Sequence, residues 1–307
     1  MTETILEIKN LKKSYGKNEV LKDISLSVKK GEVISIIGSS GSGKSTFLRS
    51  INLLESPSGG EILYHGDNVL EKGYDLTTYR ERLGMVFQSF NLFENLNVLE
   101  NAIVAQTTVL KRDRKKAESI AKANLEKVGM GEQYWKAKPK QLSGGQKRLL
   151  AFVLCLIGKP DILFLDEPTA GMDTTTRQRF WEITNDLKKS GVTILYSSHY
   201  IEEVEHTADR ILVLHQGKLI RDTTPHAMRS EEKEKQVTLP SRFAPSLDKL
   251  ADIYDVTEKR DVVTFMTKDI ESVWSSLQAH GCRISDIEIQ NKTLLDSLFD
   301  STREDKS

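Results

Sequence analysis

The chain has 307 residues, 38% of them hydrophobic, which is enough for one large domain with a smaller one or for two medium domains. Lysine plus arginine and aspartate plus glutamate number 44 each, so no overall basic excess indicates a nucleic-acid partner. The cysteines, Cys155 and Cys282, fall in different predicted domains, which argues against a disulfide framework and favours a reduced, cytosolic setting.

Neither the N-terminal residues nor the longest apolar run of the sequence indicates a membrane segment. The opening residues MTETILEIKN carry two acidic side chains and no apolar core, so we expect no secretory signal. The longest apolar run, residues 149–157, is far shorter than the roughly 20 residues that span a bilayer. We therefore expect a protein that is soluble by itself, with any membrane supplied by a partner.

Strand and helix patterns alternate through the first 220 residues. Three short apolar runs, 33–37, 162–166 and 192–198, are typical of parallel strands covered on both faces. Residues 62–70 predict two short strands with a turn at His65-Gly66-Asp67, within a smaller antiparallel region. An amphipathic helix over 113–128 has no strand partner nearby, so we expect a helical subdomain inserted at about residues 89–146. The fold class is therefore predicted to be α/β.

The pattern changes after residue 228. A charged stretch, residues 229–236, is typical of a linker or a solvated helix end. Residues 237–300 predict a small α+β accessory domain, and residues 301–307 a tail. The accessory domain would hold a hairpin around Glu258–Asp261, a helix from about Asp269 to Gly281, a strand over 283–290 and a last helix. The apolar residues of that last helix are Leu294, Leu295, Leu298 and Phe299.

The stretch GSSGSGKST stands between an apolar strand and a helical pattern, and it matches G-x-x-x-x-G-K-[ST] in full. Glycines allow backbone amides to surround a phosphate, a lysine reaches the β- and γ-phosphates, and a serine hydroxyl binds magnesium. The following helix directs its positive end at the same anion. This context favours a phosphate site over a plain glycine-rich turn. The residues expected to contact the nucleotide are Gly38, Ser39, Ser40, Gly41, Ser42, Gly43, Lys44, Ser45 and Thr46.

An acidic pair ends the second apolar run, in ILFLDEP. Asp166 would lie at the carboxyl edge of the sheet, where it could hold magnesium through a water molecule. Glu167 could polarise an attacking water. A pair of surface acids at a strand end is the alternative, and the phosphate loop in the same chain argues against it.

A second candidate phosphate site is QLSGGQ, residues 141–146. Ser143 has the position of an N-cap for a helix over 146–157, and Gly144, Gly145 and Gln146 follow it. One chain around one nucleotide hardly needs two such sites, whereas a head-to-tail dimer would use each signature on its partner's nucleotide. A simple capped helix would explain Ser143 but not the two glycines.

Together these motifs resemble the ATP-binding cassette of ABC transporters over about residues 5–228, which implies a P-loop NTPase (RecA-like) core. By the same resemblance Tyr15 stacks on adenine, and Gln88 senses magnesium and faces the membrane subunit. Asp173 matches the D-loop aspartate and His199 the switch histidine that contacts the γ-phosphate.

The resemblance implies an ATPase whose two copies enclose two Mg–ATP. Its partners would be a second copy and integral-membrane permease subunits, with no nucleic acid. The chain would be cytoplasmic, peripheral on the inner face of the membrane.

The resemblance changes along the chain. Residues 1–146 resemble polar amino-acid uptake cassettes, and residues 147–307 resemble drug or antibiotic exporters. Leu149 and Leu154 stand where uptake cassettes usually carry arginines. Uptake is slightly favoured. The alternatives are an exporter, a recombinant or engineered chimera without a native permease, and a soluble cassette acting on ribosomes or DNA.

Overall fold

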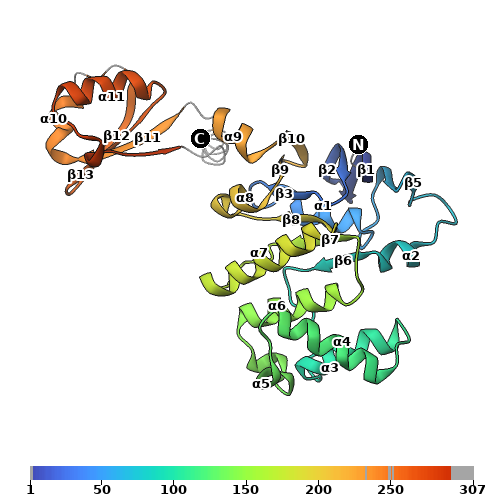
Figure 1. Cartoon of the computed structure of the whole chain (residues 1–307). Helices are drawn as coiled ribbons and strands as arrows, with labels where there is room; N and C mark the ends of the chain where they lie inside the picture. Colours follow the sequence, from blue (N-terminus) through green and yellow to red (C-terminus); the bar gives the residue numbers. More distant parts are fainter. Residues whose placement is uncertain (1–2, 232–233, 248–249, 251, 292–307) are drawn as a thin grey trace. The chain divides into compact units, whose positions relative to one another are not determined.

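The structure is a computed structural model that describes residues 3–231, 234–247, 250 and 252–291. It forms two compact units, Met1–Thr223 and Thr224–Ser307 (Figure 1). In the described part of the chain, no helix is both long and apolar enough to cross a membrane.

A six-stranded sheet in the order β10-β9-β3-β8-β7-β6 forms the centre of the first unit. All neighbours are parallel except β10 and β9, which are antiparallel. Every residue of β3, β7 and β8 is buried, as the apolar runs predicted. The carboxyl ends of parallel strands meet at one edge, so the segments after β3, β7 and β8 meet there. The strands are β3 (Val33–Ile37), β6 (Leu83–Val86), β7 (Ile162–Asp166), β8 (Thr193–Ser197), β9 (Arg210–His215) and β10 (Lys218–Thr223).

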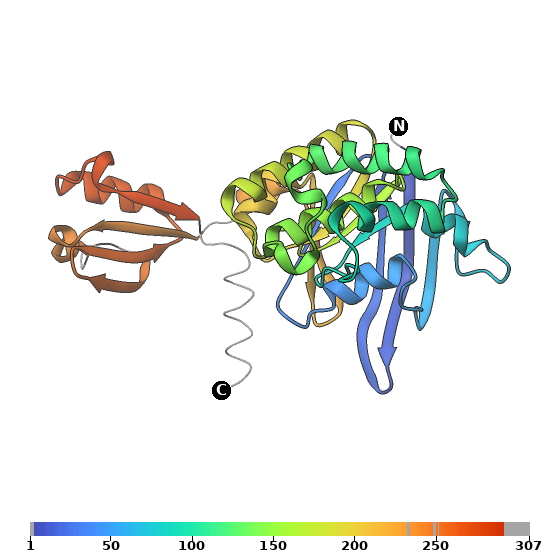
Figure 2. The same cartoon turned by 90° about the horizontal axis from the view of Figure 1, so that it is seen from below.

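A second, antiparallel sheet has the order β2-β1-β4-β5. Its strands are β1 (Thr4–Tyr15), β2 (Asn18–Lys29), β4 (Gly59–Tyr64) and β5 (Asp67–Asn68). The first two form the long dark-blue hairpin of Figure 2. The predicted turn joins β4 to β5: His65 and Gly66 have φ of 50° and 92°, which suits the twist of a two-residue hairpin loop.

One hydrophobic core joins the two sheets through α1 (Lys44–Ile51). Phe47, Leu48 and Ile51 are fully buried between side chains of both sheets. The helix that follows the phosphate loop is therefore immobilised by packing on both sides, which keeps its first turn in a constant position.

Helices gather on one side of the first unit, drawn in green in Figure 1. They are α3 (Val98–Thr108), α4 (Arg114–Lys127), α5 (Glu132–Trp135), the 3-10 turn η1 (Pro139–Gln141) and α6 (Gly144–Leu156). The predicted amphipathic helix is α4: Asp113 caps it, and Ala117, Ala121 and Leu125 are buried. The rings of Phe152 on α6 and Phe180 on α7 (Thr174–Lys189) lie 4.6 Å apart. Shorter helices are α2 (Leu76–Glu81) and α8 (Ile201–Thr207).

The second unit holds an antiparallel sheet in the order β12-β13-β11-β14. The predicted hairpin and helix are confirmed as β12–β13 and α11, which Asp269 caps. Its core includes Val237, Phe265 and Leu277. Its elements are α9 (Pro225–Glu231), β11 (Lys235–Pro240), η2 (Ser241–Phe243), α10 (Ala244–Leu247), β12 (Ile253–Lys259), β13 (Val262–Thr267), α11 (Ile270–Ala279), η3 (Ile284–Asp286) and β14 (Glu288–Asn291).

One prediction for this unit differs from the structure. The strand predicted over 283–290 begins only at Glu288, because the Arg283 N–H donates to the Asp286 carboxylate (3.1 Å) and closes a 3-10 turn. The charged stretch 229–236 was predicted to be a linker or a helix end; its residues 229–231 end α9, and its residues 235–236 begin β11. The predicted last helix around Leu294 lies outside the described residues.

Candidate active site

The glycine-rich loop joins β3 to α1, as predicted. Gly38 has φ of 154°, and a Cβ there would lie 2.1 Å from the Leu214 carbonyl oxygen. Gly43 has φ of 104°, and its Cβ would lie 2.9 Å from a Leu21 methyl. Both positions therefore need glycine. Gly43 is also the N-cap of α1 and offers no side-chain acceptor, so the first amides of the helix stay available to an anion.

Lys44 begins α1 and is buried. Its Nζ donates hydrogen bonds to the carbonyl oxygens of Gly38 (2.8 Å) and Ser39 (3.1 Å), which ties both ends of the loop together. Burial lowers the pKa of Lys44, while the charges of Glu167 and Asp166 act in the opposite direction. The ammonium group is thus held at the base of the loop.

Asp166 ends β7, and its side chain is fully buried. Its Oδ1 accepts hydrogen bonds from the hydroxyls of Ser45 and Ser197, each at 2.9 Å. Its Oδ2 is buried and accepts no hydrogen bond from the described residues; Arg49 Nη2 lies 3.9 Å away. A buried carboxylate oxygen without a hydrogen bond, next to a serine hydroxyl, fits the oxygen ligands that Mg²⁺ prefers. The described residues hold no cluster of three His, Cys, Asp or Glu that could bind a metal alone.

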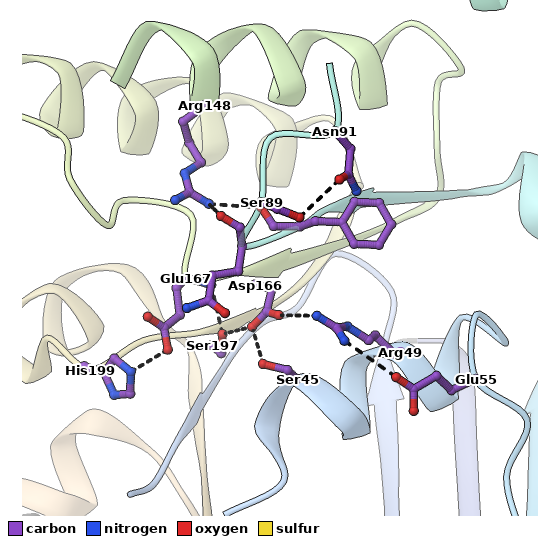
Figure 3. A network of polar contacts seen from close by, with 12 residues as sticks. Ser45, Arg49, Glu55, Ser89, Asn91, Arg148, Asp166, Glu167, Ser197 and His199 are labelled. Atoms are coloured by element: carbon purple, nitrogen blue, oxygen red, sulfur yellow. Dashed lines mark hydrogen bonds and ion pairs between the residues drawn. The ribbon is translucent and has the colours of Figure 1, made fainter. Parts of the chain in front are cut away.

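Glu167 follows Asp166 in the left-handed region, with φ of 51°. The Glu167 N–H donates to the Ser197 hydroxyl at 2.9 Å, and its carboxylate contacts the His199 imidazole. The unusual backbone turn is held by that hydrogen bond. Figure 3 shows Ser45, Asp166, Ser197, Glu167 and His199 as one continuous chain of polar contacts.

The signature around Ser143 forms a capping box at the start of α6. The Ser143 hydroxyl accepts from the Gln146 N–H (3.2 Å), and the Gln146 side chain accepts from the Ser143 N–H (2.9 Å). Gly144 is exposed, and a Cβ there would touch nothing within 4 Å, so the fold of this chain does not require a glycine. Throughout the described residues, no hydrogen bond or ion pair links the signature to the phosphate loop.

In the described part of the chain, no hydrogen bond or ion pair joins the remaining predicted residues directly to the five residues of that chain of polar contacts, although Tyr15 is linked to Asp166 through Glu55 and Arg49. Tyr15 ends β1 with 47% of its surface exposed; its hydroxyl donates to Glu55, and Lys13 Nζ lies 4.8 Å from the ring centre. Asp173 caps α7 by accepting from the N–H (2.9 Å) and hydroxyl (2.7 Å) of Thr176, which lowers the pKa of Asp173. Gln88 is exposed, and its carbonyl accepts from Arg148 Nη1 at 3.1 Å.

Three residues that lie at the site were not predicted from the sequence: Arg49, Arg148 and Ser197. Arg49 lies between Asp166 and Glu55, with its Nη1 3.6 Å from the Glu55 carboxylate. Arg148, on α6, also donates to the Phe87 carbonyl (3.0 Å), and burial lowers its pKa. Ser197 connects Asp166 to Glu167. Arg148 within an apolar helix and Ser197 at the end of an apolar strand were the available signals.

The family model described as ABC transporter matches residues 21–170. The arginine transport ATP-binding protein ArtM of Bacillus subtilis is 38% identical over 232 residues, which cover 76% of this chain and 96% of that protein. The glutamine transport ATP-binding protein GlnQ of Geobacillus stearothermophilus is 40% identical, covering 73% and 92%. The dimeric ATP-binding cassette MJ0796 bound to ADP and Pi has a TM-score of 0.67 at 31% identity, covering 72% and 99%.

The alignment with ArtM also bears on the change of resemblance near residue 147. It spans 232 residues, whereas only 146 residues lie before Lys147 and 161 from it onward, so one alignment crosses that point. The comparisons do not show separate origins for the two halves. The predicted P-loop fold is confirmed by the structural relatives. The chain belongs to the ABC transporter family, as an ATP-binding subunit that hydrolyses ATP to power transport.

Proposed function

We propose that this chain powers the uptake of polar amino acids through a separate integral-membrane permease, from the cytoplasmic face of the membrane. Several relatives support the substrate class, because their names specify arginine, glutamine, or histidine, lysine, arginine and ornithine transport. The chain covers 92–96% of the length of these three proteins. The cassette would comprise residues 1–228 and the accessory domain residues 237–300.

One observation carries the assignment of the active site: the contacts that run from Ser45 through Asp166 and Ser197 to Glu167 and His199. They place a phosphate-loop hydroxyl, an acidic pair and a histidine at the carboxyl edge of one sheet. Phosphoryl transfer needs mainly positioning and charge neutralisation, and this set of groups supplies both.

In the proposed mechanism, the loop amides and Lys44 bind the phosphates, and Tyr15 stacks on the adenine. Ser45 and Asp166, with Gln88, would hold Mg²⁺, which when bound neutralises phosphate charge. Glu167 orients a water molecule for in-line attack on the γ-phosphorus and accepts its proton as ADP leaves. His199 holds the γ-phosphate and the Glu167 carboxylate together.

The exposed signature supports a homodimer in which each copy completes the other's site. Ser143 and Gly144 face solvent, and the space beside Gly144 would admit a phosphate close to the backbone. The dimeric state named for MJ0796 supports the same arrangement. Gly145 and Gln146 of the signature, together with Asp173, would also border the nucleotide at the dimer interface.

The catalytic assignment is tested with Glu167→Gln. We expect this variant to bind ATP, to lose turnover and to accumulate as a dimer, because the amide cannot accept the proton that the water releases. Hydrolysis is measured by phosphate release and dimerisation by sedimentation velocity. Lys44→Ala is the control that should fail to dimerise with ATP. Turnover of Glu167→Gln at the wild-type rate would remove Glu167 from the mechanism.

The substrate class is tested with membrane partners. The chain would be co-expressed with permeases for polar amino acids or for drug export, and uptake of labelled arginine and glutamine into vesicles would be measured. ATP-dependent uptake of an amino acid is the expected result. Coupling to an exporter permease alone would establish the export alternative. Failure to couple with either class, despite ATPase activity, would favour a chimera without a native permease.

A further inference from the structure

A buried carboxylate lies beside the proposed catalytic residues without being one of them. Glu203, on α8, has a side chain that is only 6% exposed. The Thr169 hydroxyl donates to its Oε2 at 2.9 Å, and Trp181 Nε1 donates to its Oε1. The Ser198 hydroxyl lies 3.4 Å from Oε2. Such a carboxylate is stabilised only while these donors stay in place.

The donors come from three separate segments of the active site. Thr169 is two residues after Glu167, and Ser198 directly precedes His199. Trp181 lies on α7, the helix that Asp173 caps. One carboxylate therefore ties together the segment after the acidic pair, the loop of the histidine and the helix after the D-loop.

Arg177 extends these contacts on the same side of α7. Its Nε is buried without a hydrogen bond to the described residues and lies 4.0 Å from Glu203 Oε1. Its guanidinium stacks 4.9 Å from the ring centre of Tyr200, and its Nη2 donates to the Met172 carbonyl at 3.4 Å. The residues on both sides of His199 and the residue before Asp173 thus share one charged cluster.

We propose that Glu203 is a positioning residue, which holds the His199 loop in register with the segment after Glu167 and with the start of α7. The inference rests on the roles proposed above for Glu167 and His199. Glu203 touches neither nucleotide nor water in this role. Its loss would let the histidine loop move relative to the acidic pair, and a displacement of about 1 Å can cost up to about a hundredfold in rate.

The test compares Glu203→Ala with Glu203→Gln. The alanine leaves Trp181 Nε1 and the Thr169 hydroxyl without their acceptor, whereas glutamine keeps the volume and an acceptor oxygen for Trp181, and the Thr169 hydroxyl can rotate to accept. We expect Glu203→Ala to lower kcat by about tenfold or more and Glu203→Gln to retain most of it. Nucleotide affinity, measured with a fluorescent ATP analogue, should stay within about twofold for both.

Controls separate positioning from general stability. Glu182 is exposed on α7 and, among the described residues, accepts a hydrogen bond only from Gln178 (3.2 Å), so Glu182→Ala and Glu182→Gln should keep kcat within about twofold. All rates are taken at a temperature at which each variant is fully folded by circular dichroism. If Glu203→Ala does not fold, Trp181→Phe and Thr169→Val, which each remove one donor, replace it and should lower kcat with unchanged affinity.

Three results would overturn the inference. The first is a kcat within about twofold of wild type for Glu203→Ala or, if that variant does not fold, for both Trp181→Phe and Thr169→Val. The second is an equal loss of kcat in Glu203→Ala and Glu203→Gln, and the third is a loss of nucleotide affinity as large as the loss of kcat. Glu167→Gln distinguishes this failure from that of the proposed mechanism. If Glu167→Gln is inactive while Glu203→Ala is normal, only the positioning role is wrong. If Glu167→Gln hydrolyses ATP normally, the catalytic assignment itself fails.

Discussion

Replacing Ser197 by alanine removes the hydroxyl that connects the two acidic residues of the site. That hydroxyl is fully buried, donates to Asp166 Oδ1 at 2.9 Å and accepts from the Glu167 N–H at 2.9 Å. Alanine leaves the N–H of the half-buried Glu167 without a partner and deprives the buried Asp166 carboxylate of one of the two hydroxyls that donate to its Oδ1. Together these losses should reduce the free energy of unfolding by about 2–4 kcal/mol.

The same substitution should also slow hydrolysis. The Glu167 backbone, at φ of 51°, loses the hydrogen bond that holds it in this conformation, so the carboxylate is less well placed for water. We expect kcat to fall by about tenfold. Urea denaturation, followed by circular dichroism, gives the stability change, and phosphate release gives kcat.

Ser50→Ala is a matched control. Ser50 lies on α1 and is equally buried, but its hydroxyl has no hydrogen-bond partner among the described residues. Alanine there should be neutral or stabilising by a few tenths of a kcal/mol, because it also favours the helix. Equal destabilisation by Ser50→Ala and Ser197→Ala would refute the reasoning, since the effect would then come from the lost volume and not from the hydrogen bonds.

Gly38→Ala should abolish ATP binding in equilibrium dialysis, because its Cβ would lie 2.1 Å from the Leu214 carbonyl oxygen; an alanine at Gly144, with open space around it, should leave binding of ATP to the monomer unchanged. Burial lowers the pKa of Lys44 below its ordinary 10.5, so the unfolded chain binds this proton more tightly. Raising the pH toward 10.5 should therefore increase the unfolding free energy of the nucleotide-free wild type relative to Lys44→Met, and a falling difference in paired urea titrations would contradict the sign. Burial raises the pKa of Cys155 to about 12 although the residue is only half-buried, and Cys282 is buried with a raised pKa, so a thiol-reactive dye should label both cysteines more slowly in the native chain than in the unfolded one; equally rapid labelling of the native chain at pH 8 would be inconsistent with this packing.

Local sequence rules predicted the phosphate loop well. A strand, a loop with glycines at Gly38 and Gly43 and a helix starting at Lys44 all depend on neighbours in the chain, and the structure has each of them. The capping role of Ser143 is local for the same reason. The strand predicted over 283–290 starts late because a local side-chain hydrogen bond competes with extended backbone there. The Arg283 N–H donates to the Asp286 carboxylate, so the chain forms a turn at these residues.

Residues distant in sequence could be assigned only from the tertiary structure. Arg49 approaches Asp166 across 117 positions, and Arg148 reaches the Gln88 carbonyl across 60. Nothing in the neighbourhood of either arginine specifies which carboxylate or carbonyl it will meet. Their partners follow from the order of the sheet strands and from the packing of α1 in the core and of α6 against β6.

By itself, then, the sequence predicted a phosphate loop, an acidic pair and a capped glycine signature, because each is a short motif with its own local geometry, whereas the switch role of His199 was implied only by the family resemblance. Only the tertiary structure decided how these motifs are joined. Parallel strands bring Ser45, Asp166 and Ser197 to one edge, and the buried Glu203 binds donors from three segments. Such contacts form because burial leaves each polar group dependent on whichever partner the fold places within hydrogen-bonding distance.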